Sequence, residues 1–159
     1  MVTAGPERFE APKLELPEMI GHLLRACQQL HVAIWSQAFP AGVTSPQFAV
    51  LHALAAEGQL TQTTLRSRAR LDRSTAADVV RRLVVRRLVT QTRDAQDARR
   101  RVVRLTTAGR AVYAEAATRA LQVNESMLDG LSPDQRAQLL ALLNALLSHH
   151  AGLLEYQDQ

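Results

Sequence analysis

The stretch DRSTAADVVRRL, residues 72–83, has the pattern of an amphipathic helix. Asp72 can cap its start, because a carboxylate there accepts hydrogen bonds from the free amides of the first turn. Apolar side chains recur at helical spacing on one side, at Val79, Val80, Leu83 and Val84. The opposite side carries small, polar and arginine residues, so the pattern predicts a helix whose N-terminal end can enter a DNA major groove. A solvated, arginine-rich surface helix is the alternative interpretation.

The segment around this helix, residues 66–104, concentrates the positive charge of the chain. It holds thirteen of the nineteen Lys and Arg residues but only four of the fifteen Asp and Glu residues. The segment therefore has a net charge of +9, the rest of the chain −5, and the whole chain +4. One positive face of this kind is expected of a nucleic-acid-binding protein. The predicted DNA contacts on the helix are Arg73, Ser74, Thr75, Ala77, Asp78, Arg81 and Arg82.

A short hairpin is predicted directly after the helix. Residues 88–92 and 101–106 have the composition of strands, with two faces expected to alternate at Val102/Arg104 and Val103/Leu105, and the charged segment 93–100 connects the strands. A helix followed by a hairpin with a basic tip is typical of a winged helix, whose hairpin reaches a neighbouring groove or the backbone. The predicted tip contacts are Arg99, Arg100 and Arg101, with merely solubilising charge as the alternative.

The composition limits the class of protein. With 159 residues, 47% of them apolar, one domain with or without appended helices is expected, and wholesale disorder is excluded. No apolar run is long enough to span a bilayer, and no secretory signal is visible at the N-terminus. Cys27 is the single cysteine, so an intrachain disulfide is impossible. We therefore expect a soluble cytoplasmic protein with no membrane partner.

Local signals divide the chain into four parts. Residues 1–16 are expected to form a flexible N-terminal arm, and residues 17–43 to contain a long dimerisation helix that starts at Pro17. Residues 44–106 are expected to form a winged helix-turn-helix lobe, which begins with a capping box of Thr44 and Gln47. Thr61 caps the short first helix of its helix-turn-helix pair. Residues 107–155 are expected to contain the C-terminal dimerisation helices.

The last predicted helix has apolar side chains on more than one face. It starts at a second capping box, Ser132 to Gln135, and carries six leucines: Leu139, Leu140, Leu142, Leu143, Leu146 and Leu147. One chain of this length has little else to cover them. We infer a dimer built from the first helix and the last two, driven by roughly 25 cal/mol per Å² of buried apolar surface. The predicted fold is mainly α, with a small β-hairpin wing.

This order of elements resembles the MarR family of bacterial winged-helix regulators, over about residues 17–150. The resemblance is carried by the segments TSPQF (44–48), RST (73–75), RL (82–83) and LV (88–89), and most specifically by DAQDAR (94–99) and LTTAGR (105–110). It implies a homodimer that binds a pseudo-palindromic operator in double-stranded DNA and is tuned by a ligand, often an aromatic acid. By the same resemblance Arg99 contacts the minor groove and Asp97 holds it in place.

The chain departs from the family pattern at one turn. The family usually has glycine where Arg87 stands, so this turn is either shaped differently or holds Arg87 in the unfavourable αL conformation. Asp78 is a second oddity, because a carboxylate that faces phosphate is repelled. It can accept from a cytosine amine or pair with Arg81 or Arg82.

Five side chains are candidates for an effector site: His31, Trp35, Phe48, His52 and Tyr113. The resemblance places such a site between the dimer helices and the DNA-binding lobe. An imidazole and an indole suit a planar acid, by hydrogen bonding and by stacking. The alternative is that the aromatic residues are core and the histidines are satisfied or exposed. Regulators of aromatic acid catabolism, including nicotinate breakdown, are the similar subset of the family, so we expect a repressor released by a small aromatic carboxylate.

Other functions fit the sequence less well. A redox-sensing regulator would use Cys27, but this residue lies mid-stripe in the first helix, where we expect it to be buried and inert. The adjacent His149 and His150 are a poor chelating pair, so no metal is expected. No catalytic constellation or cofactor motif is present, so no enzyme is expected. A helical adaptor that binds protein through its leucine-rich last helix is the remaining alternative.

Overall fold

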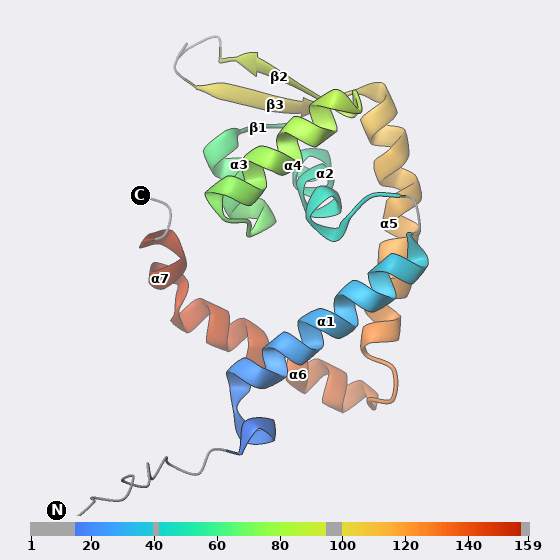
Figure 1. Cartoon of the computed structure of the whole chain (residues 1–159), viewed down its shortest axis with the longest axis vertical. Helices are drawn as coiled ribbons and strands as arrows, with labels where there is room; N and C mark the ends of the chain where they lie inside the picture. The colour runs from blue at the N-terminus through green and yellow to red at the C-terminus, as the bar shows by residue number, and fades with distance from the viewer. Residues whose placement is uncertain (1–14, 40–41, 95–99, 157–159) are drawn as a thin grey trace, which may run out of the picture.

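The computed structural model describes residues 15–39, 42–94 and 100–156. A 3-10 turn, η1 (Leu16–Glu18), precedes the first α-helix. The helices are α1 (Ile20–Ala38), α2 (Ser45–Glu57), α3 (Gln62–Ala69), α4 (Arg73–Val85), α5 (Thr107–Met127), α6 (Pro133–His149) and α7 (Ala151–Tyr156). The strands are β1 (Gln59–Thr61), β2 (Val89–Arg93) and β3 (Arg101–Leu105). Elements α2 to β3 form a winged lobe at one end, and α1, α5 and α6 form a helical region at the other (Figure 1).

Polar side chains start the helices of the winged lobe, as the sequence predicts. Thr44 and Gln47 form the expected capping box of α2, and Thr61 accepts a hydrogen bond from the amide of Thr64 at the start of α3. Asp72 caps α4 in the same way, through the amide of Thr75. Each cap satisfies an amide that has no partner within its helix, so these starts are encoded locally.

The sheet of the winged lobe has one strand more than the predicted hairpin. Its order is β1-β3-β2 and both pairings are antiparallel, with Val89 opposite Leu105 and Leu60 opposite Val103. β1 is only three residues long, too short to show a strand pattern in the sequence. Leu60 is buried and adds to the core, so β1 ties the helix-turn-helix to the wing.

The core of the winged lobe lies between its helices and the sheet. Its fully buried larger side chains come from α2, α3, α4, β2 and β3: Leu51, Leu54, Leu65, Leu83, Val50, Val89 and Val103. One prediction was wrong here. Val84 is 38% exposed, because it lies beyond the edge of the stripe of α4 that meets the core. Val102 and Val103 of β3 are both buried, whereas Arg104 between Val103 and Leu105 is exposed.

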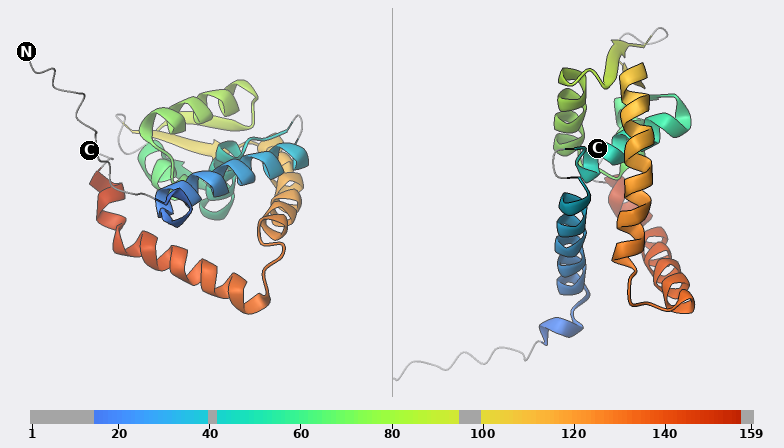
Figure 2. Two further views of the ribbon diagram at one scale, coloured as in Figure 1. Left: turned by 60° about the horizontal axis from the view of Figure 1, so that its bottom comes forward. Right: turned by 90° about the vertical axis from the view of Figure 1, so that its right-hand side faces the viewer.

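The helical region is covered less completely. α1 packs on α5, and their contact encloses a second core of Trp35, Phe39, Ala116 and Val123. α6 turns back from the end of α5 (Figure 2). None of its residues is buried within the chain. Within the described residues, no helix has both the length and the apolarity to cross a membrane.

The predicted boundaries of the helical region need two corrections. The helix expected from Pro17 starts at Ile20, because Met19 has extended backbone angles and separates it from η1. The short helix α7 was not predicted, since its sequence has no cap or periodic pattern of its own. The helices from Thr107 and Pro133 start as predicted, with Thr106 and Ser132 as their caps.

Candidate nucleic-acid interface

The start of α4 is held by the side chain of Asp72. Its carboxylate accepts from the Thr75 amide at 2.9 Å, from the Ser74 hydroxyl at 2.6 Å and from the Thr75 hydroxyl at 2.5 Å. The hydrogen bonds from the Ser74 and Thr75 side chains hold the pKa of Asp72 well below its ordinary value. The chain turns sharply at Arg70 and Leu71, just before Asp72, because Arg70 ends α3 in the αL conformation with φ at 50°. This turn sets α3 against α4 as a helix-turn-helix.

The cap changes what the first turn of α4 can offer to DNA. Ser74 and Thr75 were predicted as base contacts, and both hydroxyl protons are donated to Asp72. Each hydroxyl therefore keeps only its acceptor capacity, which suits the amino groups of adenine or cytosine. Ser74 is exposed, whereas Thr75 is half-buried. Arg73 and Ala77 are exposed on the same helix, so an arginine donor and a small apolar surface flank the hydroxyl of Ser74.

Asp78 forms ion pairs with both arginines of the next turn. One oxygen accepts from Arg81, and the other lies 2.7 Å from Nε of Arg82. The hydrogen bond from Arg81, together with the positive charge of Arg82, lowers the pKa of Asp78 below its ordinary value. All three side chains are at least a third exposed, with Arg81 at 70% and Arg82 at 63%. The sequence left pairing and cytosine contact open for Asp78, and in this structure it is paired.

The sequence predicted one positive face, but several of the arginines are not available on an open surface. Arg66 of α3 is buried, and Arg68 pairs with Glu57 of α2 at 2.6 Å. Arg86, at the end of α4, donates to the side-chain oxygen of the buried Gln47 at 3.1 Å. Arg68 and Arg86 therefore join helices of the lobe, and the sequence could not reveal this because each partner lies on another helix.

The wing extends from the lobe beside the start of α3. Arg100 and Arg101 are exposed at the base of the hairpin tip, where the amide of Asp94 donates to the carbonyl of Arg100 at 2.9 Å. Arg101 donates to Gln91 at 3.4 Å, which places its guanidinium beside β2. The predicted Arg99 contact and its support Asp97 lie outside the described residues.

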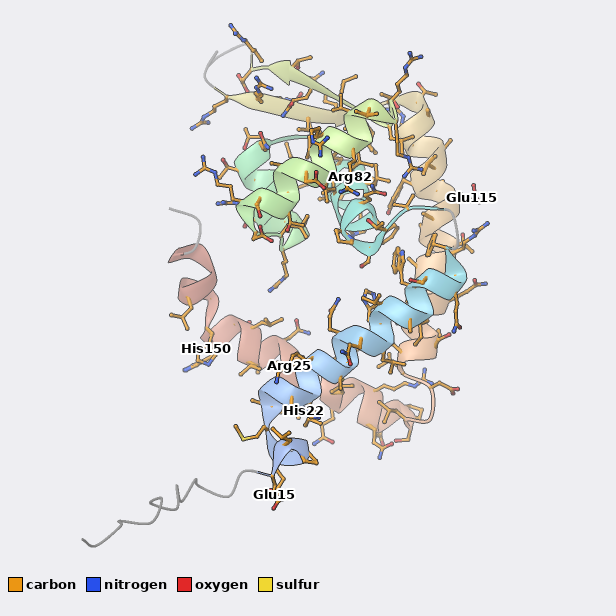
Figure 3. All side chains as sticks on the ribbon, viewed as in Figure 1. Glu15, His22, Arg25, Arg82, Glu115 and His150 are labelled. Atoms are coloured by element: carbon orange, nitrogen blue, oxygen red, sulfur yellow. The ribbon has the colours of Figure 1, made fainter. Side chains whose placement is uncertain are left out.

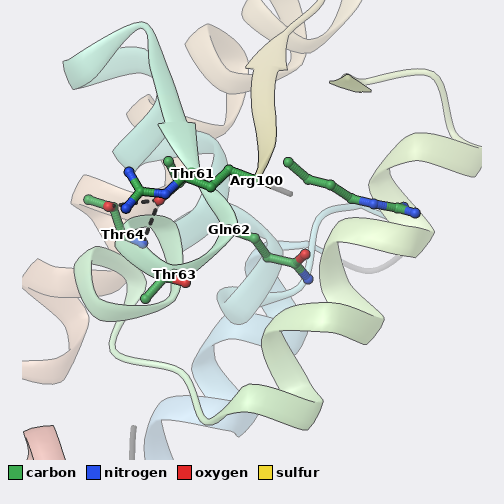
Figure 4. A pocket seen from close by; sticks show the side chains of 6 residues that line it. Thr61, Gln62, Thr63, Thr64 and Arg100 are labelled. Atoms are coloured by element: carbon green, nitrogen blue, oxygen red, sulfur yellow. Dashed lines mark hydrogen bonds between the residues drawn. The ribbon is translucent and has the colours of Figure 1, made fainter. Parts of the chain in front are cut away.

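A depression of about 520 Å³ separates the wing from α3. It is lined by the first residues of α3 and by two wing arginines (Figure 4): Thr61, Gln62, Thr63, Thr64, Arg100 and Arg101. Gln62 also accepts from Gln91 of β2 at 3.4 Å, so the wing and the helix-turn-helix are joined on this side. The depression brings cations and hydroxyl groups together on the side of the lobe that carries the wing.

The turn between α4 and the wing holds Arg87 in the αL conformation, with φ at 56°. This is the second of the two alternatives that the sequence allowed. The carbonyl oxygens of Arg87 and Leu88 accept from the Thr106 hydroxyl at 2.8 and 3.1 Å. Thr106 also caps α5 through the amide of Gly109, whose missing side chain leaves room for the carbonyl of Leu88. The LTTAGR segment therefore locks the wing to the first turn of α5.

The five predicted effector residues form one continuous group of rings, defined here as the aromatic cluster: His31, Trp35, Phe48, His52 and Tyr113. Trp35 of α1 lies 5.5 Å from Phe48 of α2, and Phe48 lies 5.9 Å from Tyr113 of α5 (ring centroids). His52 Nδ1 and the Tyr113 hydroxyl are hydrogen-bonded at 2.9 Å. The cluster therefore joins α1 and α5 of the helical region to α2 of the winged lobe.

Phe39 belongs beside this cluster but was not predicted. It is buried, stacks on Trp35 at 4.5 Å and lies under the guanidinium of Arg119. Its spacing of four residues from Trp35 was the available signal. The Trp35 indole N–H donates to the carbonyl of Val43 at 2.8 Å, which fixes the orientation of the Trp35 ring.

The remaining candidates are placed apart from both sites. Cys27 is exposed, so the prediction that it is buried is wrong for the single chain, because none of the described residues covers that side of α1. The rings of His149 and His150 meet edge to face at 4.7 Å. Among the residues that the structure describes, no three His, Cys, Asp or Glu side chains are grouped as metal ligands. Figure 3 shows His22 and Arg25 on α1, far from Arg82 on α4.

Known proteins similar to this chain share its winged helix-turn-helix. The profile of the MarR family matches residues 41–100, which contain the helix-turn-helix and most of the wing. The transcriptional repressor NicR of Pseudomonas putida is 34% identical over 134 residues, which are 84% of this chain and 85% of NicR. The chain belongs to the MarR family. It is a DNA-binding transcription regulator and not an enzyme.

Two solved MarR-family neighbours share nearly the whole fold. PcaV from Streptomyces coelicolor, in complex with its natural ligand, has a TM-score of 0.81 and 39% identity, covering 87% of this chain and 98% of PcaV. BpsR from Bordetella bronchiseptica has a TM-score of 0.81 and 34% identity, covering 85% of this chain and 97% of BpsR. 6-Hydroxynicotinic acid regulates the DNA binding of BpsR. These neighbours confirm the predicted winged-helix fold.

Proposed function

We propose that this MarR-family regulator is a cytoplasmic homodimeric repressor that a small aromatic carboxylate releases from its operator. The aromatic cluster carries the proposal. It lies where the winged lobe meets the helical region, and it combines flat apolar rings with the polar edges of His31, His52 and Tyr113. Rings of this kind stack on a planar acid, and the imidazole and phenol groups can hydrogen-bond its carboxylate or ring substituents.

The uncovered helices support a homodimer. Leu23, Leu24 and Leu30 of α1 are 44–50% exposed, and Leu142 and Leu146 of α6 are 63% and 42% exposed. Several half-exposed leucines on each of two helices are typical of a protein interface. In the dimer, the two α4 helices would enter major grooves about one turn, or ~10 bp, apart on a pseudo-palindromic site. Each protomer would then make the predicted DNA contacts of α4 and the wing with its own half-site.

The proposed release is a change in the distance between the two α4 helices. The cluster touches α1, α2 and α5, so a ligand that separates these rings alters the angle between the lobe and the dimer helices. A ligand acts in this way only if it binds the released state more tightly than the DNA-bound state. BpsR, whose DNA binding responds to 6-hydroxynicotinic acid, is the reason to begin with that class of ligand.

Fluorescence tests the proposal, because Trp35 is the single tryptophan of the chain and lies in the cluster. The wild type is titrated with 6-hydroxynicotinate, 4-hydroxybenzoate and, as the non-carboxylate control, phenol. Anisotropy of a DNA duplex from the region flanking the protein's own gene is recorded in parallel at several salt concentrations. We expect one acid to change Trp35 emission and to weaken DNA binding at the same concentration.

A matched variant locates the ligand. Tyr113→Phe keeps the ring contact with Phe48 but removes the hydroxyl that bonds His52. Losing one hydrogen bond to a charged ligand weakens acid binding by roughly tenfold, at about 1.5 kcal/mol, while DNA affinity without the acid stays unchanged. Acid binding that is unaffected by this change, or that leaves Trp35 emission unchanged, would place the effector elsewhere.

The exposed thiol of Cys27 favours one second candidate, a redox-sensing regulator. The same DNA titration after mild peroxide treatment distinguishes the two. DNA release by peroxide in the wild type but not in Cys27→Ser would support the redox sensor. A helical adaptor is tested in the same assay, since binding to DNA falls steeply with salt and apolar association does not.

A further inference from the structure

Asp78 lies on the outer side of α4, with 38% of its side chain exposed. At about 100° per residue, Ser74, Asp78 and Arg81 lie within roughly 60° of arc, opposite the buried Val79 and Leu83. DNA that meets the start of α4 therefore meets this carboxylate as well. A lone carboxylate there would be repelled by phosphate, yet this one is held by two arginines.

The ion pairs have the favourable order for a helix. The acid precedes its bases by three and four residues, and the distance from Arg82 Nε to the Asp78 carboxylate is short, at 2.7 Å. The three groups together carry a charge of +1 where two arginines without the acid would carry +2. Each positive charge that contacts a phosphate adds about 0.9 to the slope of binding against salt, whatever the DNA sequence. Asp78 thus removes attraction that does not depend on sequence.

Held arginines differ from mobile ones in specificity. An arginine with freely moving side chain binds any phosphate within reach, whereas one fixed by a carboxylate presents its remaining donors in one direction. A bidentate contact with guanine requires such a fixed direction. The negative charge of Asp78 therefore weakens binding mainly to DNA of arbitrary sequence, since operator DNA can use the ordered donors of Arg81.

We propose that Asp78 is a specificity-determining residue, which weakens binding to arbitrary DNA by holding Arg81 and Arg82 away from the phosphates. This inference rests on the proposed operator binding, and it adds a residue that acts against the wrong DNA sequences. Specificity of this kind depends on a repulsive element as well as on attractive contacts.

The test compares Asp78→Asn with the wild type on two duplexes. One is a random-sequence duplex, and the other is a site that the wild type selects from a random pool; binding is followed by anisotropy across a potassium chloride series. Asparagine keeps the shape but loses the charge. We expect Asp78→Asn to bind the random duplex about fivefold more tightly, with a salt slope steeper by about one unit. The selected site should gain less, so the ratio of the two affinities falls.

Two further variants control for charge and for fold. Glu115→Gln removes the same charge from a similar i to i+4 pair with Arg119, on α5 and away from α4, and should leave the ratio unchanged. Asp78→Glu keeps the charge and should keep most of the discrimination. Circular dichroism confirms that each variant is folded.

The outcomes separate this inference from the proposed function. If the wild type discriminates but Asp78→Asn binds random DNA no more tightly, the role of Asp78 is overturned and operator binding stands. If Glu115→Gln has the same effect, the change reflects net charge alone and the inference fails. If the wild type recovers no preferred site, sequence-specific binding fails, and the specificity role of Asp78 fails with it.

Discussion

The winged lobe and the helical region bury their apolar side chains to different extents. In the lobe, Leu51, Leu65 and Leu83 have at most 1% of their surface exposed. In the helical region, no residue of α6 is buried, and Leu142 is 63% exposed. Both regions are rich in leucine, so composition does not explain the difference. The lobe closes its core with its own helices and sheet, whereas α1 and α6 keep apolar side chains exposed in the single chain.

The junction between the two regions gives the largest expected effect. A Cβ on Gly109 would lie 1.9 Å from the carbonyl oxygen of Leu88, a backbone atom at the start of the wing. Neither α5 nor the wing can move without losing the Thr106 hydrogen bonds that join them. We expect Gly109→Ala to lower the free energy of unfolding by about 3 kcal/mol or more, measured by urea unfolding followed by circular dichroism.

Gly21→Ala is the matched control for Gly109. It lies within α1, and an added Cβ would meet nothing within 4 Å. Alanine has the higher helix propensity, so this variant should be unchanged or up to about 1 kcal/mol more stable. Similar losses in the two variants would mean that the close contact at Leu88 is relieved cheaply and that the junction is not rigid.

The next effect tests the difference between the two regions directly. Leu83 is 0% exposed, so Leu83→Ala leaves a cavity in the core and should destabilise the lobe by about 2–5 kcal/mol. Leu139→Ala combined with Leu146→Ala removes two half-exposed side chains from one stripe of α6. We expect this double variant to leave the unfolding of the lobe nearly unchanged and to weaken self-association by about 10- to 100-fold, measured by analytical ultracentrifugation. A double variant that unfolds like Leu83→Ala would show that α6 is already packed within one chain.

The local signals in the sequence predicted most of the fold. The caps at Thr44, Thr61, Asp72 and Ser132 each satisfy an amide three residues away, so a short segment contains the whole interaction. The strand β1 was missed because it acquires its structure only by pairing with β3, more than forty residues later. Fold class could therefore be read from neighbours in sequence, and the third strand could not.

The candidate sites divide in the same way. Helical spacing placed Arg73 and Asp78 on the outer side of α4, but the spacing could not show that Arg86 reaches Gln47 or that Arg66 is buried. Residue type suggested Ser74 as a base contact, and only the folded structure shows that its proton is donated to Asp72. The aromatic cluster needed the resemblance to a family, because its rings come from three helices that span residues 31–113.

The smallest expected effect concerns the backbone of Arg87, at the point where the lobe departs from its family. The residue has φ at 56°, a conformation that costs a side chain with a Cβ about 1–2 kcal/mol and costs glycine little. Glycine also loses more entropy on folding, by roughly 0.5–1 kcal/mol, so the two terms partly cancel. We expect Arg87→Gly to stabilise the lobe by about 0.5–1 kcal/mol in urea unfolding. Arg86→Gly is the control, because its φ of −75° gives glycine no advantage and its bond to Gln47 is lost.

Arg87 lies at the C-terminal end of α4, whereas the predicted base contacts lie at its start. The change to glycine should therefore leave affinity for the selected DNA site unchanged, within the small loss expected from one fewer surface charge. A less stable Arg87→Gly variant would show that the arginine side chain makes contacts which outweigh its backbone strain. A loss of DNA affinity with a salt slope lower by about one unit would show that these contacts are to phosphate, and that the lobe binds DNA with both ends of α4.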